Sequence, residues 1–166
     1  MELENFQLKP IGIIHSEHKV LDQIPAQPVF AKDCIGRVMI YRAYLDGLKD
    51  IEEFSHIYLL PFFHKVESVN LTVKPYLQNA EKGLFATRYP NRPNPIGLSI
   101  VELIEREDNI LHVKGIDILD GTPLLDIKPY SARFDKIENT KNGWQDQVDE
   151  SKANELGLRN YKGKTE

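Results

Sequence analysis

Cysteine is almost absent from the sequence, with one residue, Cys34, among 166. This scarcity excludes an intramolecular disulfide and a zinc site built from several cysteines, so we expect Cys34 to be a small buried apolar residue. Long apolar runs are absent too. No segment approaches the roughly 20 apolar residues of a membrane helix, and "MELENFQLKP" at the start is unlike a secretory signal. We therefore expect a soluble, cytoplasmic protein with no membrane partner.

The common nucleotide-binding signatures are also missing. No G-x-G-x-x-G follows an apolar strand, and the spacing G-x-x-x-x-G-K-S/T of a phosphate-binding loop does not occur. A dinucleotide-binding or doubly wound methyltransferase fold therefore has no support. His15 and His18 in "HSEH" lack a nearby cysteine or a helical H-E-x-x-H, so we expect strand-end or surface histidines and no metal site.

Charge is unevenly distributed along the chain. The formal net charge of −4 argues against a protein whose whole surface binds nucleic acid. Residues 61–100, however, hold five lysines and arginines against two glutamates, a local charge of +3 that leaves −7 for the rest. Such a segment is typical of a local docking site for phosphate, although an uneven solvated surface explains the same count.

The apolar pattern predicts a mainly antiparallel β-barrel, closed or half-closed, with short helices. Segments rich in β-branched and aromatic residues predict strands at 8–16, 36–41, 55–66, 71–77, 83–88, 97–107, 110–119 and 123–130. The turn "EDN" predicts a hairpin, and Pro61 predicts a bulge or an edge position because proline cannot donate to the ladder. Apolar residues spaced by three predict a short amphipathic helix at 45–54.

Composition changes after Phe134. We expect a barrel domain at 1–134 followed by a polar C-terminal extension at 135–166, with a helix at 145–156. The low hydrophobicity of the extension predicts a peripheral element or tail.

The proline-rich stretch "RYPNRPNPIGLS", residues 88–99, is the most specific feature. Each proline fixes φ and lacks an N–H, so the loop is stiff and presents carbonyls without their usual turn partners. These carbonyls, together with the side-chain amide of Asn94, suit a ligand that carries a cation, an adenine edge and hydroxyls. A stiff connection between strands, with Arg88 and Arg92 paired to surface acids, is the alternative.

Two further motifs carry polar groups in apolar surroundings. In "DILDGTPLLDIKPY", Asp120 and Gly121 form a turn pair, and the charges of Asp126 and Lys128 need a ligand or each other. In "FFHKV", His64 follows two aromatic residues, which is typical of a structural histidine as well as of a catalytic one.

Three stretches together resemble the TsaA-like family, which includes tRNA methyltransferases of the TrmO type. They are "EEFSHIYLLPFFHK", "FATRYPNRPNPIGLSIVEL" and "DGTPLLDIKPY", in this order, within a similarity from about Ile11 to Tyr130. The resemblance implies a non-Rossmann β-barrel that binds S-adenosylmethionine and acts as a homodimer. It also implies methylation of the exocyclic nitrogen of threonylcarbamoyl-adenosine beside the anticodon of threonine tRNAs.

The resemblance also implies functional residues. The family's cofactor contacts fall on Pro25, Ala26, Gln27, His64, Lys65, Arg88, Leu98, Asp120, Gly121, Thr122 and Pro123. Methyl transfer to a ureido-linked nitrogen requires removal of a proton, so we expect a base among His64, Asp120 and Asp126. Arg92 and Lys128 are expected to bind substrate.

The sequence departs from the family pattern at two places. It has "PAQ" where bacterial members have "PRQ", and it has no D-P-R-P-A-Y motif of a further C-terminal domain. Two alternatives therefore remain open: a non-catalytic module that binds S-adenosylmethionine, and a methyltransferase for another small or RNA substrate.

Overall fold

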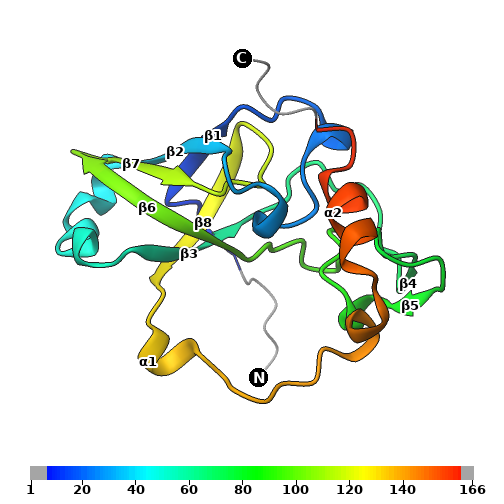
Figure 1. Ribbon diagram of the computed structural model, residues 1–166. Coiled ribbons are helices and arrows are strands. Elements are labelled where there is room, and N and C mark those ends of the chain that lie inside the picture. Colours follow the sequence, from blue (N-terminus) through cyan, green and yellow to red (C-terminus); the bar gives the residue numbers. More distant parts are fainter. Residues whose placement is uncertain (1–6, 162–166) are drawn as a thin grey trace, which may run out of the picture.

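A closed barrel of six antiparallel strands forms the centre of the computed structural model, which describes residues 7–161 (Figure 1). The strands close in the order β1-β2-β7-β6-β3-β8. Their bounds are β1 Gly12–Ser16, β2 Ile35–Ile40, β3 His56–Pro61, β6 Ser99–Glu107, β7 Ile110–Lys114 and β8 Thr122–Pro129. The predicted fold class is confirmed.

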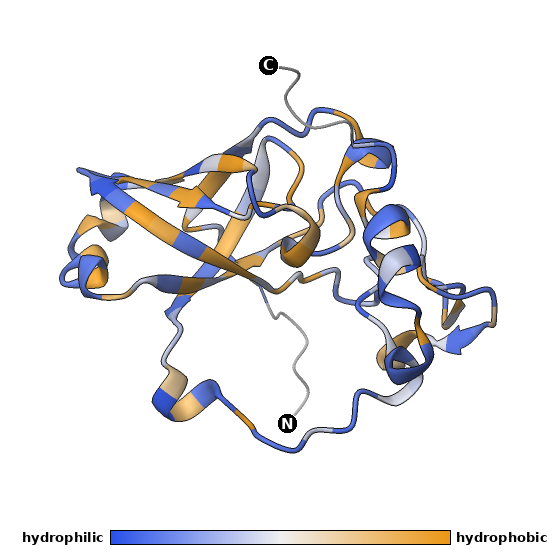
Figure 2. Cartoon of the chain, viewed as in Figure 1, coloured by the Kyte–Doolittle hydropathy of each residue, from blue (hydrophilic) through white to orange (hydrophobic). Residues whose placement is uncertain are grey.

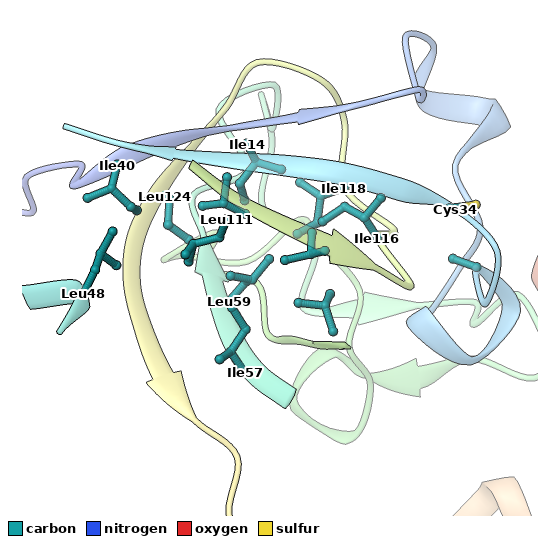
Figure 3. Packing of buried hydrophobic residues seen from close by; sticks show 14 residues of the cluster. Ile14, Cys34, Ile40, Leu48, Ile57, Leu59, Leu111, Ile116, Ile118 and Leu124 are labelled. Atoms are coloured by element: carbon teal, nitrogen blue, oxygen red, sulfur yellow. The ribbon is translucent and has the colours of Figure 1, made fainter. Parts of the chain in front are cut away.

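Alternation along the strands builds the core inside the barrel. Figure 2 shows apolar and polar residues alternating along the strands, and in β1 every second residue is buried. The core side chains, several of them drawn in Figure 3, include Ile14, Val38, Ile40, Ile57, Leu59, Val101, Leu111, Val113, Ile116, Ile118 and Leu124. Each such burial contributes about 1.5–3 kcal/mol. Cys34 is 1% exposed in the same cluster, as predicted.

The end of β3 confirms the interpretation of its proline. The pairing of β3 with β8 shifts register between Leu60 and Pro61, which is the expected bulge. Beyond it, the chain leaves the barrel as a loop instead of continuing as strand to 66. Gly97 packs against this corner so closely that an added Cβ would lie 2.4 Å from the Phe63 ring and 2.7 Å from Pro61.

The predictions of a helix at 45–54 and of a strand at 110–119 are wrong in part. The helix expected at 45–54 is two 3₁₀ helices, η3 Arg42–Leu48 and η4 Ile51–Glu53, because apolar spacing of three fits three residues per turn. The left-handed backbone of Asp50 separates them. The strand expected at 110–119 ends at Lys114, where Gly115 turns the chain with a φ of 87°.

The strands expected at 71–77 and 83–88 are also mostly absent. They form only the two-residue pair β4 Thr72–Val73 and β5 Lys82–Gly83, followed by the 3₁₀ helix η5 Leu84–Ala86. Pro75 has no N–H with which to extend the first strand. The hairpin predicted between 97–107 and 110–119 is confirmed by the pairing of β6 with β7.

Strand register places the long connections at one end of the barrel. The pairs Ser16↔Gly36, Ile35↔Lys114 and Leu59↔Ser99 lie at the end from which loops 17–34, 62–98 and 115–121 leave. We call this the loop end; it lies at the right of Figure 1 and includes the 3₁₀ helices η1 Leu21–Gln23 and η2 Pro28–Phe30. The opposite hairpin end holds the turn 108–109 and the connection 41–55.

After β8 the chain forms short helices outside the barrel. They are α1 Ala132–Asp135, η6 Gly143–Gln147 and α2 Glu150–Leu158. Asp149 caps α2 by accepting the backbone N–H groups of Ser151 and Lys152. The helix predicted at 145–156 thus lies across η6 and α2. Within residues 7–161, no helix has the length and apolar character needed to cross a membrane.

Candidate functional site

Two predicted cofactor residues from distant loops meet at the loop end. Arg88 Nη1 donates a hydrogen bond of 2.9 Å to Gln27 Oε1, across 61 residues of sequence. Arg88 is exposed, so the rest of its guanidinium faces solvent. Next to Gln27, Pro25 is buried and the Ala26 N–H donates to the Gly157 carbonyl at 2.7 Å. The bridge between Gln27 and Arg88 therefore presents a cation at this end of the barrel.

A carboxylate missed by the sequence interpretation, that of Asp117, is influenced by the charge of Arg88. Ser99 Oγ donates a hydrogen bond of 2.6 Å to Asp117 Oδ1. Burial raises the pKa of Asp117 to about 6, although the Ser99 bond and the positive charge of Arg88 work to lower it. Leu98, the residue before Ser99, is 48% exposed. The site thus combines a cation, an acid that titrates near neutrality and an exposed apolar side chain.

Arg92 holds the proline loop together from inside. Its Nη1 lies 3.1 Å from the Thr87 carbonyl oxygen and 3.4 Å from those of Leu84 and Tyr89, and its guanidinium lies over the Phe85 ring at 5.5 Å. The hydrogen bonds of Arg88 and Arg92 described above go to neutral oxygens, so the structure does not support the alternative in which both arginines pair with surface acids.

The carbonyls of the proline loop are used more inside the protein than we expected. Those of Pro90 and Asn94 accept N–H groups of their own loop, and that of Pro95 accepts the Phe63 N–H at 2.8 Å. The bond from Phe63 to Pro95 joins the loop to the segment after β3, where His64 and Lys65 are exposed. Partial burial and the charge of Lys65 lower the pKa of His64.

Asp120 holds the turn before β8. Its carboxylate lies 2.7 Å from Lys19 Nζ and 3.4 Å from His15 Nδ1, and it accepts the Ser16 N–H at 3.0 Å. Partial burial works to raise the pKa of Asp120, but the bonds from Lys19, Ser16 and His15 together lower it. A carboxylate engaged in this way is a weak candidate for a base.

The remaining predicted residues of the turn support the same corner. Gly121 adopts a φ of 76°, and Thr122 Oγ1 donates to the Leu119 carbonyl at 2.7 Å. The Pro123 carbonyl accepts the Phe62 N–H at 2.9 Å, which joins this turn to the chain after β3.

Asp126 and Lys128 lie farther along β8 and pair with each other. Lys128 Nζ is 2.7 Å from Asp126 Oδ2, which confirms the alternative of a pair on one face of the strand. They lie opposite Leu60 and Tyr58 of β3, away from Thr122 and the loop end. The structure therefore does not bring these two residues to the bridge between Gln27 and Arg88.

The two histidines of "HSEH" make protein contacts. His18 is buried and its Nε2 lies 2.9 Å from the Ile116 carbonyl, while His15 lies beside Asp120. Within residues 7–161, no group of three or more His, Cys, Asp or Glu side chains is arranged to hold a metal ion.

Comparison with known proteins finds matches to the part of the chain that forms the barrel and its loops. Residues 13–136 match the model of the tRNA-methyltransferase O N-terminal domain. A probable S-adenosyl-L-methionine-binding protein of Pyrococcus abyssi is 54% identical over 136 residues, which cover 82% of this chain and 74% of that protein. The tRNA (adenine(37)-N6)-methyltransferase of Escherichia coli is 39% identical over 138 residues, covering 77% of this chain and 59% of the enzyme.

A solved structure agrees with these relatives. The crystal structure of TrmO from Pseudomonas aeruginosa superposes with a TM-score of 0.70 at 36% identity, covering 84% of this chain and 62% of that one. The chain thus spans less than two thirds of that structure and of the Escherichia coli enzyme. Sequence motifs, barrel topology and family model agree, and this chain belongs to the family of the tRNA-methyltransferase O N-terminal domain.

Proposed function

We propose that this protein is an S-adenosylmethionine-dependent methyltransferase acting on the exocyclic nitrogen of threonylcarbamoyl-adenosine next to the anticodon of tRNA. The observation that carries the proposal is the grouping of Gln27, Arg88 and Asp117 at the loop end. The names of the relatives in Pyrococcus and Escherichia coli support the cofactor and the reaction.

The residues at the loop end fit the cofactor chemically. Arg88 offers guanidinium N–H groups to a carboxylate, and the Asp117 carboxylate offers an acceptor to an ammonium group or a ribose hydroxyl. Leu98 and Phe85, which is 74% exposed, offer apolar surface to an adenine ring. When bound, S-adenosylmethionine supplies an electrophilic methyl group. The protein's part is to orient the acceptor nitrogen and to take its proton.

We propose Asp117 as the base, on the strength of its raised pKa and its position beside Ser99 at the loop end. A base works best when its pKa lies near the working pH, and burial brings the pKa of Asp117 to about 6. Asp120 is held by Lys19, and Asp126 is paired to Lys128 outside the loop end. His64, exposed beside the proline loop, is the remaining candidate from the sequence.

The substrate is recognised by its threonylcarbamoyl group in this proposal. That group brings a carboxylate, which the guanidinium of Arg92, together with the exposed Lys65, would hold by a charge-assisted bond. A chain with a net charge of −4 gains little from broad counterion release, so recognition of the modified base matters more.

The test is methyl transfer to threonine tRNA with and without the threonylcarbamoyl group, followed by mass spectrometry of the nucleosides. We expect product from the modified tRNA and little or none from the unmodified transcript. Arg92→Lys should reduce this preference, because an ammonium cannot form the two-pronged bond of a guanidinium to a carboxylate. Equal methylation of both tRNAs by the unaltered protein would contradict recognition of the modification.

A second candidate function is a binding module without catalysis. The relative from Pyrococcus abyssi, 54% identical, carries a name that states binding of S-adenosyl-L-methionine and no reaction. Calorimetry that detects cofactor binding, combined with no methyl transfer to any threonine tRNA, would favour this candidate.

We also propose that the protein acts as a homodimer. Apolar side chains remain exposed on β6 and just before it, with Leu98, Ile100 and Ile104 between 38% and 50% exposed. Burial of such surface against a second copy would remove it from water. Sedimentation should give about twice the 19.1 kDa chain mass, and a monomer at every concentration would contradict the proposal.

A further inference from the structure

The last described part of the chain lies against the loop end of the barrel. We call residues 143–161 the C-terminal arm; it comprises η6, α2 and the three residues after α2. Figure 1 shows the chain crossing from α1 to the region of β4 and β5 and then rising along α2 beside the loop that follows β1. The matched family domain ends at residue 136, before the arm begins.

Two hydrogen bonds join the arm to the loops that carry Gln27 and Arg88. Trp144 Nε1 donates to the Ala86 carbonyl at 2.8 Å, two residues before Arg88. The Gly157 carbonyl accepts the Ala26 N–H at 2.7 Å, one residue before Gln27. The arm therefore holds the backbone on both sides of the bridge without occupying the bridge itself.

Close packing reinforces the second of these contacts. Gly157 lies so near the Phe30 ring of η2 that an added Cβ would be 2.4 Å from the ring carbons. The neighbouring Arg159 lies over the Tyr76 ring at 4.5 Å, which ties the arm to loop 62–98 as well. The C-terminal arm thus touches both long loops of the site.

The end of the arm is anchored on the barrel. The Tyr161 hydroxyl donates to Glu17, and its ring meets the buried His18 ring edge-on at 5.3 Å. Tyr161 also packs against the core cluster. Burial raises the pKa of Tyr161 above its ordinary value, so the hydroxyl stays a donor. Because Tyr161 fixes the end of the arm, it also restrains the positions of Gly157 and Trp144 relative to the loops that they contact.

We propose that the C-terminal arm is a positioning element of the site, which sets the loop of Gln27 relative to the loop of Arg88. That the ligand of this site is S-adenosylmethionine rests on the function proposed above. The coupling of the two loops through the arm does not depend on that function. Shifting the arm at either hydrogen bond should loosen both loops and weaken the guanidinium's hold on a carboxylate.

The test uses substitutions in the full chain. Gly157→Ala forces α2 away from Phe30, and Trp144→Phe removes the donor to Ala86 while keeping a ring. Gly47→Ala is the matched control, because an added Cβ there has no neighbour within 4 Å. By calorimetry with S-adenosylmethionine, we expect roughly tenfold weaker binding for Gly157→Ala, several-fold weaker binding for Trp144→Phe and no change for the control.

A double-mutant cycle separates positioning from general support. In an Arg88→Ala background, Gly157→Ala should cost little further affinity, because the arm acts through Arg88. Full additivity of the two losses would contradict the proposal. Tighter binding of S-adenosylmethionine to the Gly157→Ala variant would also contradict the proposal, because it would show that the arm obstructs the site.

Hydrogen exchange tests the coupling without any cofactor. Gly157 packs against Phe30 in loop 17–34. We nevertheless expect Gly157→Ala to speed hydrogen exchange also at the Thr87 N–H, which donates to the Leu84 carbonyl in loop 62–98. Faster exchange confined to residues 26–31 would overturn the coupling. If the unaltered protein binds no S-adenosylmethionine, the proposed function fails, while this measurement still decides the role of the arm.

Discussion

The two ends of the barrel have the same strands but different connections and different charge. At the hairpin end four acids lie close together, namely Asp46, Asp50, Glu52 and Glu53. Arg106 Nη1 donates to the Glu52 carboxylate at 3.0 Å and to the Leu48 carbonyl at 2.9 Å. At the loop end, Arg88 is bonded to a neutral amide oxygen and remains exposed. At the hairpin end the charge of Arg106 is neutralised inside the protein, whereas at the loop end the charge of Arg88 stays available to a ligand.

Connection length explains this difference. A two-residue turn and two 3₁₀ helices close the hairpin end locally. The loop end carries three connections, and two of them, 17–34 and 62–98, are longer than either connection at the hairpin end. Their side chains meet only because the strands share a register. Long loops on a rigid barrel can place polar groups without disturbing the core, which is why function concentrates there.

The largest expected effect is on the rate of methyl transfer. Asp117→Asn removes the proposed base, so single-turnover transfer should fall by about 100-fold or more. In the unaltered protein the rate should rise with pH through an apparent pKa of about 6, and this step should vanish in the variant. Asp126→Asn, on the face of β8 away from the loop end, serves as the control and should keep the profile.

The stability of the same variant supplies an independent check of the pKa. The pKa of Asp117 is raised in the folded state from 3.8 to about 6, so the buried charge destabilises the fold fully above about pH 6. This penalty disappears as pH falls below 3.8. Asp117→Asn should therefore raise the free energy of unfolding at pH 8 and change it little at pH 4. Equal effects at both pH values would show that the carboxyl is not titrating as described.

Next in size is the loss of cofactor affinity when the exposed cation is removed. Arg88→Ala should weaken binding of S-adenosylmethionine by about 10- to 100-fold, the range of a charge-assisted hydrogen bond. Arg42→Ala at the hairpin end removes another exposed arginine, which pairs with Asp108 at 2.9 Å. Calorimetry should show no change there. Similar losses in both variants would mean that net charge, rather than position, decides affinity.

A smaller effect is expected on stability at the corner that supports the proline loop. Gly97→Ala places a methyl group into Phe63 and Pro61, which should lower the free energy of unfolding by about 1–3 kcal/mol. Gly47→Ala at the hairpin end has open space and should be nearly neutral. Urea unfolding measures both, and a neutral Gly97→Ala would show that the corner relaxes at no cost.

The smallest effect concerns tRNA. Lys65→Ala removes one exposed cation beside the proline loop and should weaken tRNA binding by about two- to fivefold, with a shallower dependence on salt. Lys49→Ala at the acidic hairpin end should have no effect. A larger loss from Lys49 would place the RNA at the other end of the barrel.

Several local features could be predicted from the sequence because their causes are local. The hairpin at 108–109 follows from its turn residues. The bulge at Pro61 and the pairing of Asp126 with Lys128 were each one of two alternatives that the missing N–H and the period-two spacing left open. The strands expected at 71–77 and 83–88 failed because apolar composition does not supply a pairing partner.

The sequence by itself determined the barrel, the stiffness of the proline loop and the family, because proline geometry, alternation and motif order are properties of neighbouring residues. Only the tertiary structure decided which side chains meet. The bridge from Gln27 to Arg88, the bond from Ser99 to Asp117 and the docking of the C-terminal arm each join segments far apart in sequence. Such contacts leave no periodic signal, since they arise from strand register and from burial, which also sets the pKa of Asp117.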